Sequence, residues 1–559
     1  MSLQALIAKW SVGWRGPAAA AFIAFLAGLP GLVAAPVLDR DEARFAQATA
    51  QMLETGDLVV IQFQDQPRFK KPVGIHWLQA ASVSALSSPE ARDIWAYRIP
   101  SLLGAMLAAA ACAWGAAAFF GGPAGLWAGV LLGGSFLLST EAFIAKTDAV
   151  LAGSVTLAMA AMGRLYAAAR GGPAPGRAAL PLMWLAIAVS ILVKGPVGPL
   201  IFGLALITLG LWDRRPRWMT RLRWYWGLIV VLVVVGPWAG AVTVATDGEF
   251  WRTALIADLA PKLAGAQENH GAPPGYHTLL TPILAFPLTL LLPAAAVVAW
   301  WRRKEAGVRF AVAWFLPALL FFELTPTKLP HYPLPAYGGL ALLAAAALVK
   351  PIDARARWIG ASLGALVGLL LAVGVGVLFS LYGDPTDLPV AILAAVLALA
   401  AGLAGAWLMV RDETRPALAS ALALGMLAHA AVLAGLAPRL DPLWISARTE
   451  RALATARLLP RQGLADAPVA VAGFAEPSLV FALGTNTQLG GGAIAAKAIS
   501  EARPAVVEAR EEPAFRAALA RAGLTARPVA KVAGLNYSRG DPVSLTVYMS
   551  PVVPAAAAR

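Results

Sequence analysis

The chain has 559 residues, of which 59% are hydrophobic and 14% are charged, and its net charge is +14. Because soluble globular chains are about one quarter charged, this composition excludes a soluble enzyme, a disordered chain and a collagen-like chain. The mean hydropathy of +0.68 predicts a membrane protein with many helical spans. The positive charge then orients the loops, and the single cysteine, Cys112, excludes a disulfide framework.

Thirteen apolar segments each have about the length that a lipid bilayer requires. The first follows Lys9 and Arg15 and lacks a small-residue cleavage site, so it is predicted to be an anchor and not a cleaved signal. A shorter stretch, 73–88, contains His76 and is predicted to be an interfacial helix. The predicted spans are 17–38, 95–119, 123–140, 147–168, 178–192, 196–212, 223–246, 278–300, 307–324, 332–349, 356–381, 387–410 and 414–437.

Charge in the short loops predicts which way the chain crosses the membrane. Basic loops stay in the cytoplasm, and all of them fall on one side only if 73–88 does not cross. The N-terminus is then inside, and three segments lie outside: 39–94, 247–277 and the tail from 438. The basic loops are 164–177, 214–223, 302–304, 350–357 and 411–415.

A helix is predicted at the start of the first outside segment, within residues 38–57. Phe45, Ala48 and Met52 recur at helical spacing, so they would share one face. Gly56 follows as a suitable helix stop.

Acidic residues gather where this helix begins. Asp39 and Glu42 have the spacing of a capping box, and the helix dipole favours acids in a first turn. The helix directly follows a span, however, so these acids would lie beside lipid phosphates that repel them unless they have a task. Arg44, three residues after Asp41, can share its face. The sequence therefore allows two interpretations, helix-end acids and acids of a functional site.

Basic and aromatic residues follow in the same outside segment. Arg68, Lys70 and Lys71 flank Phe69 and precede Trp77. This composition suits anionic headgroups, either those of a substrate or those of the surrounding lipids.

Two charged residues are predicted at the outer ends of spans. Asp148 is a site candidate, because acids at the membrane boundary are expensive, and the alternative is a solvated helix cap. Lys194 lies at the tip of a tight outside hairpin, where it either contacts a lipid phosphate or extends to the membrane surface.

The other two outside loops carry weaker signals. His270 and His277 are weak metal candidates, because their spacing matches no strong zinc motif. Lys328 and Tyr332 lie among several prolines at the membrane rim, which is unusual for a bare linker.

The tail after residue 437 has the composition of a small folded domain. Its length, about 120 residues, is sufficient for one α/β domain. Gly490–Gly492 is not a phosphate loop, because no Lys-Ser/Thr follows. The tail is expected to act as a lid or docking domain. Strands are predicted over 469–474, 506–508, 527–532 and 543–549, and helices over 476–483 and 513–522.

Together these motifs resemble the membrane C-type glycosyltransferases. The branch is the one that contains the lipid A aminoarabinose transferases and the bacterial protein O-mannosyltransferase-like enzymes (glycosyltransferase family 39/83 type). The similarity covers the whole chain in order, and its Asp-Glu-x-Arg-Phe-Ala and Lys-Leu-Pro-x-Tyr elements are fairly specific to the branch. The matching motifs are Asp41–Ala46 with Gly56 and Asp57, Lys71-Pro72 with Trp77, Thr147–Ala149, Lys194-Gly195, His270–Pro274, Lys328–Pro335 and Glu476–Phe481.

The resemblance implies a mainly α, polytopic protein of the bacterial inner membrane. Its transmembrane domain would span residues 1–437, with about thirteen helices and a cytoplasmic N-terminus. Periplasmic loops would occupy 39–94, with interfacial helices, and 247–277. Residues 438–559 would form a periplasmic α/β domain, and the protein is expected to be a monomer.

The implied activity is transfer of a hexosyl or pentosyl sugar from an undecaprenyl (polyprenyl) phosphate donor. The acceptor would be lipid A, lipopolysaccharide or another envelope glycan, and direct displacement predicts inversion. By resemblance, Asp41 is the main catalytic carboxylate and Asp148 the second acid. Substrate-binding roles fall to Glu42, Arg44, Lys71, Lys194, His270, Lys328 and Tyr332.

One departure from the branch concerns a metal. Lys70 stands where the aminoarabinose transferases have a metal-contacting acid, so no cofactor is predicted and a divalent metal stays an alternative. Two other functions stay open: protein O-glycosylation of exported chains, and a lipid-sugar flippase. A flippase would place acids within the spans, whereas here they lie on outside loops. The expected partners are the donor, the acceptor and membrane lipids, with no nucleic acid.

Overall fold

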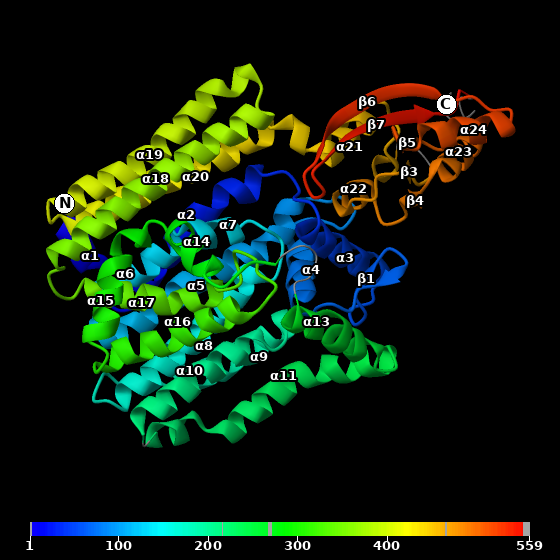
Figure 1. Cartoon of the computed structure of the whole chain (residues 1–559). Coiled ribbons are helices and arrows are strands. Elements are labelled where there is room, and N and C mark those ends of the chain that lie inside the picture. Colours follow the sequence, from blue (N-terminus) through cyan, green and yellow to red (C-terminus); the bar gives the residue numbers. More distant parts are fainter. Residues whose placement is uncertain (1–2, 215, 266–270, 464–466, 552–559) are drawn as a thin grey trace.

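The computed structural model describes residues 3–214, 216–265, 271–463 and 467–551. Long helices lie side by side in a bundle, and a small α/β domain formed by the tail lies at one end of it (Figure 1). The predicted fold class, a mainly helical membrane protein with a small C-terminal sheet domain, is confirmed.

In the described part of the chain, eight helices are long and apolar enough to cross a membrane. A further pair, α14 (Tyr276–Leu284) with α15 (Leu292–Trp301), is bent by 113°. With four shorter apolar helices these make thirteen segments, which coincide with the thirteen predicted ones, although the crossing of the shorter helices stays a prediction. The long helices are α2 (Arg15–Ala34), α5 (Ile94–Phe120), α8 (Asp148–Ala168), α11 (Trp224–Ala245), α16 (Ala306–Leu324), α18 (Ala354–Tyr382), α19 (Leu388–Val410) and α20 (Thr414–Ala430), and the shorter ones are α6 (Gly122–Gly133), α9 (Ala179–Lys194), α10 (Val197–Asp213) and α17 (Tyr337–Ala347).

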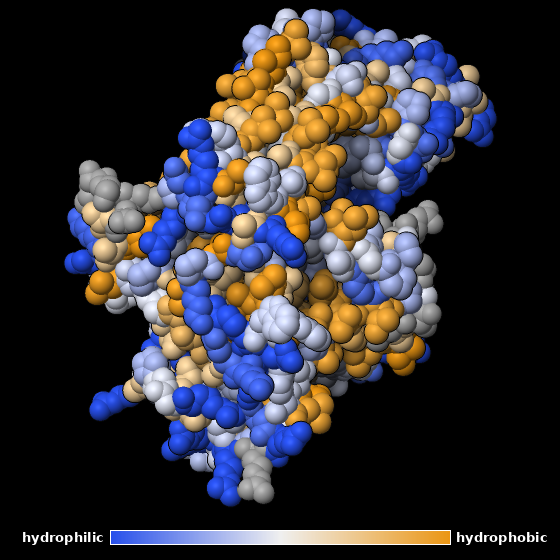
Figure 2. Space-filling model, turned by 60° about the vertical axis from the view of Figure 1, so that its left-hand side comes forward, coloured by the Kyte–Doolittle hydropathy of each residue, from blue (hydrophilic) through white to orange (hydrophobic). Residues whose placement is uncertain are grey.

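The outer helices expose large apolar side chains. Leu232 on α11 is 59% exposed, and Leu366 on α18 and Leu393 on α19 are similarly open. Figure 2 shows broad hydrophobic areas on one face, with hydrophilic atoms gathered between them. Such a surface is stable only in contact with lipid tails, so the outer helices define the face that meets the bilayer.

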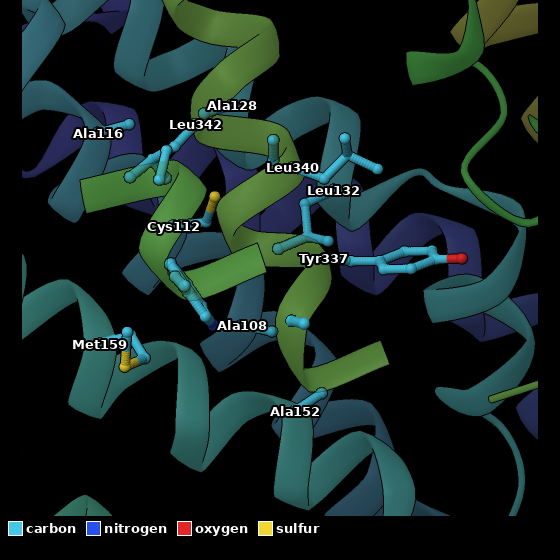
Figure 3. Packing of buried hydrophobic residues seen from close by; sticks show 14 of the residues in the cluster. Ala108, Cys112, Ala116, Ala128, Leu132, Ala152, Met159, Tyr337, Leu340 and Leu342 are labelled. Atoms are coloured by element: carbon cyan, nitrogen blue, oxygen red, sulfur yellow. The ribbon is translucent and has the colours of Figure 1, made fainter. Parts of the chain in front are cut away.

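Helix α17 occupies the centre of the bundle, and all its residues are buried. Leu340 and Leu342 of α17 pack among small side chains of α5 and α8, including Ala108 and Ala152 (Figure 3). Cys112 is buried in the same cluster. Small residues allow membrane helices to approach closely. The neighbouring helices can therefore surround the short helix α17 on every side.

The crossing of α5 and α8 fixes the first residue of α8, Asp148. A Cβ atom on Gly104 would lie only 2.7 Å from the carbonyl carbon of Ala149, and Gly153 faces Gly104 across the same crossing. Only glycine permits this approach. The backbone next to Asp148 is therefore held directly against α5.

The loops fall into two groups at opposite ends of the bundle. At one end, the Asp213 carboxylate accepts from Arg170 at 2.5 Å and from Arg309 at 2.6 Å. Arg170 lies in the predicted basic loop 164–177, while Asp213 and Arg309 lie next to the predicted basic loops 214–223 and 302–304. At the other end, Lys71 lies 3.4 Å from Asp258, so the first and second outside segments meet. This grouping agrees with the loop pairing predicted from charge.

The tail domain contains a five-stranded sheet in the order β4-β3-β5-β7-β6. Strand β3 is parallel to β4 and β5, and β7 is antiparallel to β5 and β6. The four predicted strands and two predicted helices are present, whereas β4, α21 and α23 were not predicted. The elements are α21 (Ile445–Thr455), β3 (Ala470–Ala472), α22 (Pro477–Leu483), β4 (Gln488–Gly490), α23 (Gly492–Ser500), β5 (Ala505–Glu508), α24 (Glu512–Arg521), β6 (Arg527–Asn536) and β7 (Asp541–Met549).

The first outside segment folds into α3 (Asp41–Thr55), a hairpin of β1 (Gln62–Phe63) and β2 (Gln66–Pro67), and α4 (Gly74–Leu86). Helix α3 ends at Gly56, which has φ 74°, as predicted. The stretch predicted to be an interfacial helix is helical, as α4, while its position at the interface stays a prediction.

The predicted capping box at the start of α3 is wrong. The N-cap residue is Arg40, with φ 59° and no side-chain cap bond. The Glu42 carboxylate instead accepts from the backbone of Leu38 and from the side chain of Arg98. The spacing predicted that the Glu42 carboxylate would cap α3, but the carboxylate pairs with Arg98 of α5 instead.

Candidate active site

A charged cluster lies where α8 begins and α9 ends. Because the two helices run in opposite directions, Asp148 and Lys194 reach the same end of the bundle, and they form an ion pair. Lys146 Nζ lies 3.6 Å from Asp148 Oδ2 and 3.0 Å from Glu141 Oε2. We use the term charged cluster for Glu141, Lys146, Asp148, Lys194 and His331.

His331 and Tyr332 come from the loop after α16. His331 Nε2 lies 3.7 Å from Asp148 Oδ1, and the Nδ1 atom lies 3.9 Å from Glu141 Oε1. Burial lowers the pKa of His331 to about 3, so its ring is neutral between the two carboxylates. The Lys194 ammonium lies 5.5 Å from the centre of the Tyr332 ring, close enough for a cation–π contact.

Asp41 lies at the edge of the charged cluster. It is the first residue of α3, and its side chain is exposed. Although burial opposes the shift, Glu141, Asp148 and Asp41 together raise the pKa of Lys146. Since Glu42, the next residue, accepts from the backbone N–H of Ala145, the start of α3 lies next to the segment that carries Lys146. The Asp41 carboxylate is thus exposed, whereas the carboxylates of Glu141 and Asp148 are buried and paired with lysines.

Glu42 lies in a different environment from its neighbour. It is 1% exposed, and its oxygens accept from Arg98 Nε and Nη2, each at 2.8 Å. It also accepts from the backbone N–H of Ala145, which leads into the charged cluster. Glu42 thus ties α3 to α5 and to the backbone before Lys146, while its role in substrate binding stays a prediction.

Lys71 lies in the first outside segment, between β2 and α4. It pairs with Asp258, which also accepts from Lys262 at 2.7 Å. Burial, together with the charges of Lys262 and Lys194, lowers the pKa of Lys71 to about 8, although Asp258 opposes the shift. The ammonium is therefore only weakly held in its charged form, and an added anion would stabilise it.

Lys328 is not open to substrate in this structure. It is 4% exposed, and its ammonium donates to the carbonyls of Ala272 at 2.9 Å and Thr325 at 2.7 Å. These bonds clamp the second outside loop to the third. Lys328 therefore positions these loops in this structure, and its contact with substrate stays a prediction.

Of the two histidines predicted as weak metal candidates, only His277 belongs to the part of the chain that the structure describes. His270 lies outside the described residues. His277 is fully buried on α14, and neither of its ring nitrogens has a hydrogen-bond partner among the described residues. In residues 3–214, 216–265, 271–463 and 467–551, no three His, Cys, Asp or Glu side chains gather into a metal site.

Several residues of the site were missed by sequence reasoning. Lys146 lies two residues before Asp148, and its charge at a span boundary was a usable signal. Glu141 falls at the end of a predicted span, where a buried acid needs a partner. His331 lies inside the third-loop motif. Arg98 is buried near the start of a predicted span, where a charged residue likewise needs a partner.

The tail domain contacts the first outside segment directly. The backbone N–H of Asp39, just before α3, donates to the hydroxyl of Tyr537 at 2.6 Å, although the two residues are 498 positions apart. Gln47 Nε2 donates to Thr485 Oγ1 at 2.7 Å, and Phe481 packs edge-on against Tyr97. The helix that carries Asp41 is thus held between the bundle and the tail domain (Figure 1).

Comparison with known proteins shows the fold. The crystal structure of ArnT from Cupriavidus metallidurans bound to undecaprenyl phosphate superimposes with a TM-score of 0.72 over 94% of this chain and 96% of that one, at 22% identity. The chain has the ArnT fold. The apo structure of the same ArnT agrees equally well, with a TM-score of 0.72 over 93% of this chain and 95% of that one, at 21% identity.

Sequence relatives carry matching names, and the resemblance expected from the motifs is confirmed. The undecaprenyl phosphate-alpha-4-amino-4-deoxy-L-arabinose arabinosyl transferase 2 of Pseudomonas fluorescens (strain Pf0-1) is 30% identical over 341 residues, which are 60% of each chain. The transferase of Pseudomonas aeruginosa (strain UCBPP-PA14) is 31% identical over 313 residues, which are 56% of this chain and 55% of that one. The match therefore spans less than two thirds of these relatives. No family model matches the chain.

Proposed function

We propose that this protein is a glycosyltransferase that takes a sugar from an undecaprenyl-phosphate donor and passes it to lipid A, lipopolysaccharide or another envelope glycan. The names of its relatives and its ArnT fold support this reaction class. The protein would work in the bacterial inner membrane as a monomer. Its N-terminus would be cytoplasmic, and the charged cluster and tail domain periplasmic.

One observation carries the proposal: the exposed carboxylate of Asp41 is at the start of α3, next to the segment that leads into the buried charged cluster at one end of the helix bundle. A donor lipid anchored in the bilayer would bring its phosphate to this end. Lys71, Lys194 and Tyr332 would hold that phosphate, and fixed cations in a water-poor site stabilise the charge that builds on it as it leaves.

The reaction is a direct displacement at the anomeric carbon. An acceptor oxygen forms a bond to that carbon while the bond to the phosphate oxygen breaks, so the leaving group is undecaprenyl phosphate and the configuration inverts. If the acceptor is a hydroxyl, Asp41 takes its proton as the general base. If the acceptor is a phosphate, it is already an anionic nucleophile, and Asp41 orients the sugar.

Asp148 would act by holding the side chains of the neighbouring lysines in place. It engages Lys194, Lys146 and His331 at once, so removal of the carboxylate would leave three groups without their common partner. Glu42 would fix the position of Asp41 through Arg98 and is a positioning residue. These roles follow from contacts, and each one can be tested separately.

Protein O-glycosylation of exported chains is the second candidate, because an exposed general base suits a serine or threonine hydroxyl. A flippase is the third. Cells with and without the gene separate the first two: altered lipid A, measured by mass spectrometry, supports the proposal, and unchanged lipid A with altered exported proteins supports the second candidate.

A purified-protein assay tests the activity itself. Labelled undecaprenyl-phosphate sugar is mixed with lipid A and with wild type, Asp41→Asn or Glu90→Gln, an exposed acid away from the charged cluster. We expect transfer by wild type and Glu90→Gln, and at least about a hundredfold loss in Asp41→Asn. Transport without transfer would refute the enzyme, and full activity of Asp41→Asn would refute the role of Asp41.

A further inference from the structure

A hollow lies beside the turn that joins α1 (Leu3–Trp10) to α2. In Figure 1, α1 lies at the end of the bundle away from the tail domain. The hollow has a volume of about 650 Å³, within the range of about 300–1,000 Å³ that ligand pockets have. Its walls come from α2, α5, α6, α8 and α9, and most side chains on them are apolar or small. Among the described residues that line it, Arg164 of α8 is the only charged one.

Arg164 lies far from the charged cluster. It follows Asp148 by sixteen residues on α8, which is a rise of about 24 Å along the helix axis. Two residues after it, Tyr166 donates to Asp213 at 3.2 Å, and Asp213 also accepts from Arg309. Arg164 therefore lies at the end of the bundle where the basic loops meet, which their charge predicts to be cytoplasmic. The hollow is thus separate from the candidate active site.

The Arg164 guanidinium is only partly engaged by the protein. Its Nε atom donates to the carbonyl of Pro175 at 3.2 Å, and Nη1 donates to the carbonyl of Trp114 at 3.1 Å. The guanidinium carbon also lies 4.8 Å from the centre of the Trp114 ring. Within the described parts of the chain, Nη2 has no hydrogen-bond partner and no carboxylate pairs with Arg164. Because a cation at membrane depth is costly without a counter-charge, an anion would stabilise Arg164.

Other half-buried arginines beside the predicted cytoplasmic loops have a carboxylate partner. The pairs are Arg302 with Glu305, Arg309 with Asp213, and Arg357 with Asp412. Arg164 differs from them, because two carbonyls, an indole ring and the hollow surround its guanidinium. Trp14 and Leu107 also line the hollow and are exposed, so the hollow is open to the outer surface of the bundle. The phosphate of a membrane lipid can therefore reach Arg164.

The apolar wall of the hollow has the length of one lipid leaflet. On α5 the lining residues extend from Leu107 to Ala117, which is a rise of about 15 Å. The hydrocarbon core of a bilayer is about 30 Å thick, so this wall matches half of it. Arg164 contacts Trp114, near the Ala117 end of the wall, and that end is the one nearer to the predicted cytoplasm. The hollow thus has a cation at its headgroup side and an apolar wall that extends toward the bilayer centre.

We infer that the hollow binds an anionic phospholipid of the inner leaflet, with the lipid phosphate at Arg164 and one acyl chain along α5. Guanidinium N–H groups fit phosphate oxygens, and basic pockets between membrane helices on the cytoplasmic side bind anionic headgroups. A zwitterionic lipid has the same phosphate and acyl chains, but it also carries a cation, which Arg164 repels. The site therefore selects lipids with a net negative charge. This inference does not depend on the transfer reaction proposed above.

The first test measures lipid selectivity. The full-length protein, purified in detergent, is titrated with dioleoyl phosphatidylglycerol or with dioleoyl phosphatidylcholine, and native mass spectrometry measures the bound lipid. The two lipids share their acyl chains and differ in net charge. We expect wild type to bind phosphatidylglycerol at least about fivefold more tightly than phosphatidylcholine. Equal affinities for the two lipids would overturn the inference.

The second test removes the cation. Arg164→Gln should weaken phosphatidylglycerol binding at least about tenfold. The matched control is Arg303→Gln, because Arg303 also lies 4.8 Å from the centre of an indole ring, that of Trp300, but is exposed and does not line the hollow. The control should keep the wild-type affinity. Unchanged binding by Arg164→Gln, or an equal loss in both variants, would overturn the inference.

A third variant fills the hollow and leaves Arg164 in place. Ala110 is half-buried on the wall, so Ala110→Phe should exclude the acyl chain and weaken phosphatidylglycerol binding at least about tenfold. Val396→Phe, at a site on α19 that is 56% exposed, is the control and should bind as wild type does. This variant decides the matter if Arg164→Gln, which also loses two bonds to carbonyls, fails to fold. Full binding by Ala110→Phe would overturn the inference.

A competition experiment separates a lipid from a soluble phosphate. Glycerol 3-phosphate has a phosphate group but no acyl chains, so about a hundredfold excess should leave phosphatidylglycerol bound, because the buried chain supplies most of the affinity. Displacement by glycerol 3-phosphate would assign Arg164 to soluble phosphate esters and overturn the inference.

Discussion

Asp41 and Glu42 are consecutive residues of α3, yet the first is exposed while the second is buried in an ion pair with Arg98. Adjacent residues on a helix point about 100° apart, so one can face the charged cluster while the next faces α5. The buried pair holds the helix in place, and the exposed acid is left available for chemistry.

This arrangement predicts that two amide substitutions differ strongly in their effect on stability. Glu42→Gln would leave the Arg98 guanidinium buried without a counter-charge, which destabilises a protein by about 3–5 kcal/mol. Asp41→Asn changes an exposed group and should alter stability by no more than about 0.5 kcal/mol. Thermal unfolding of both variants in the same detergent measures the difference. Equal melting temperatures would show that the Glu42–Arg98 pair does not position α3.

The ion pair between Asp148 and Lys194 predicts non-additive losses. Asp148→Asn and Lys194→Met should each reduce the rate of transfer at least about a hundredfold, because each leaves the donor phosphate without organised cations. The double variant should be no worse than the poorer single variant, since the two groups act as one unit. Initial rates at saturating donor provide the measurement. Losses that multiply would mean that the residues act independently.

The lowered pKa of Lys71 predicts a pH limit for donor binding. Because Lys71 loses its proton near pH 8, the KM for the donor should rise as the pH increases through this value. Asp258 raises this pKa, so Asp258→Asn should move the limit to lower pH. Lys71→Arg keeps its charge at all these pH values and should abolish the limit. Donor KM measured from pH 6.5 to about 9.5 tests all three proteins, and a limit that persists in Lys71→Arg would assign it to another group.

The contact of Phe481 with the bundle predicts that the tail domain stabilises α3. Phe481 is 1% exposed and packs against Tyr97, so Phe481→Ala should destabilise the protein by about 3–5 kcal/mol. Hydrogen exchange should rise in α3 as well as in α22, because the two helices pack together. Phe22→Ala, the same change at a lipid-facing site that is 58% exposed, is the control. Unchanged exchange in α3 would mean that the tail domain does not support it.

The sequence predicted the helices well, because the spacing of apolar residues and the glycine that ends a helix are both features of a short stretch of sequence. The spacing of Phe45, Ala48 and Met52 and the stop at Gly56 gave α3, whose final bounds are Asp41–Thr55. The apolar segments gave the bundle helices for the same reason. In the tail, β4 and α23 were missed, because β4 is three residues long and the two are separated only by glycine.

The partners of the site residues were not predictable in this way. Glu42 pairs with Arg98, 56 residues later, and no local signal links them. His331, in the loop after α16, lies near Asp148 at the start of α8, although the two are far apart in the sequence. The motif residues Asp41, Asp148 and Lys194 were found because each is a charge at the end of an apolar segment. Their catalytic and binding roles stay predictions until the variants above are measured.

The hydrogen bonds between α3 and the tail domain also impose an order of assembly. Gln47 and Thr485 are 438 residues apart, and Asp39 and Tyr537 are 498 apart. A ribosome makes α3 early and these partners last, so the helix that carries Asp41 gains its outer support only when synthesis is nearly complete. A chain interrupted before residue 470 would contain every apolar helix of the bundle and still lack that support.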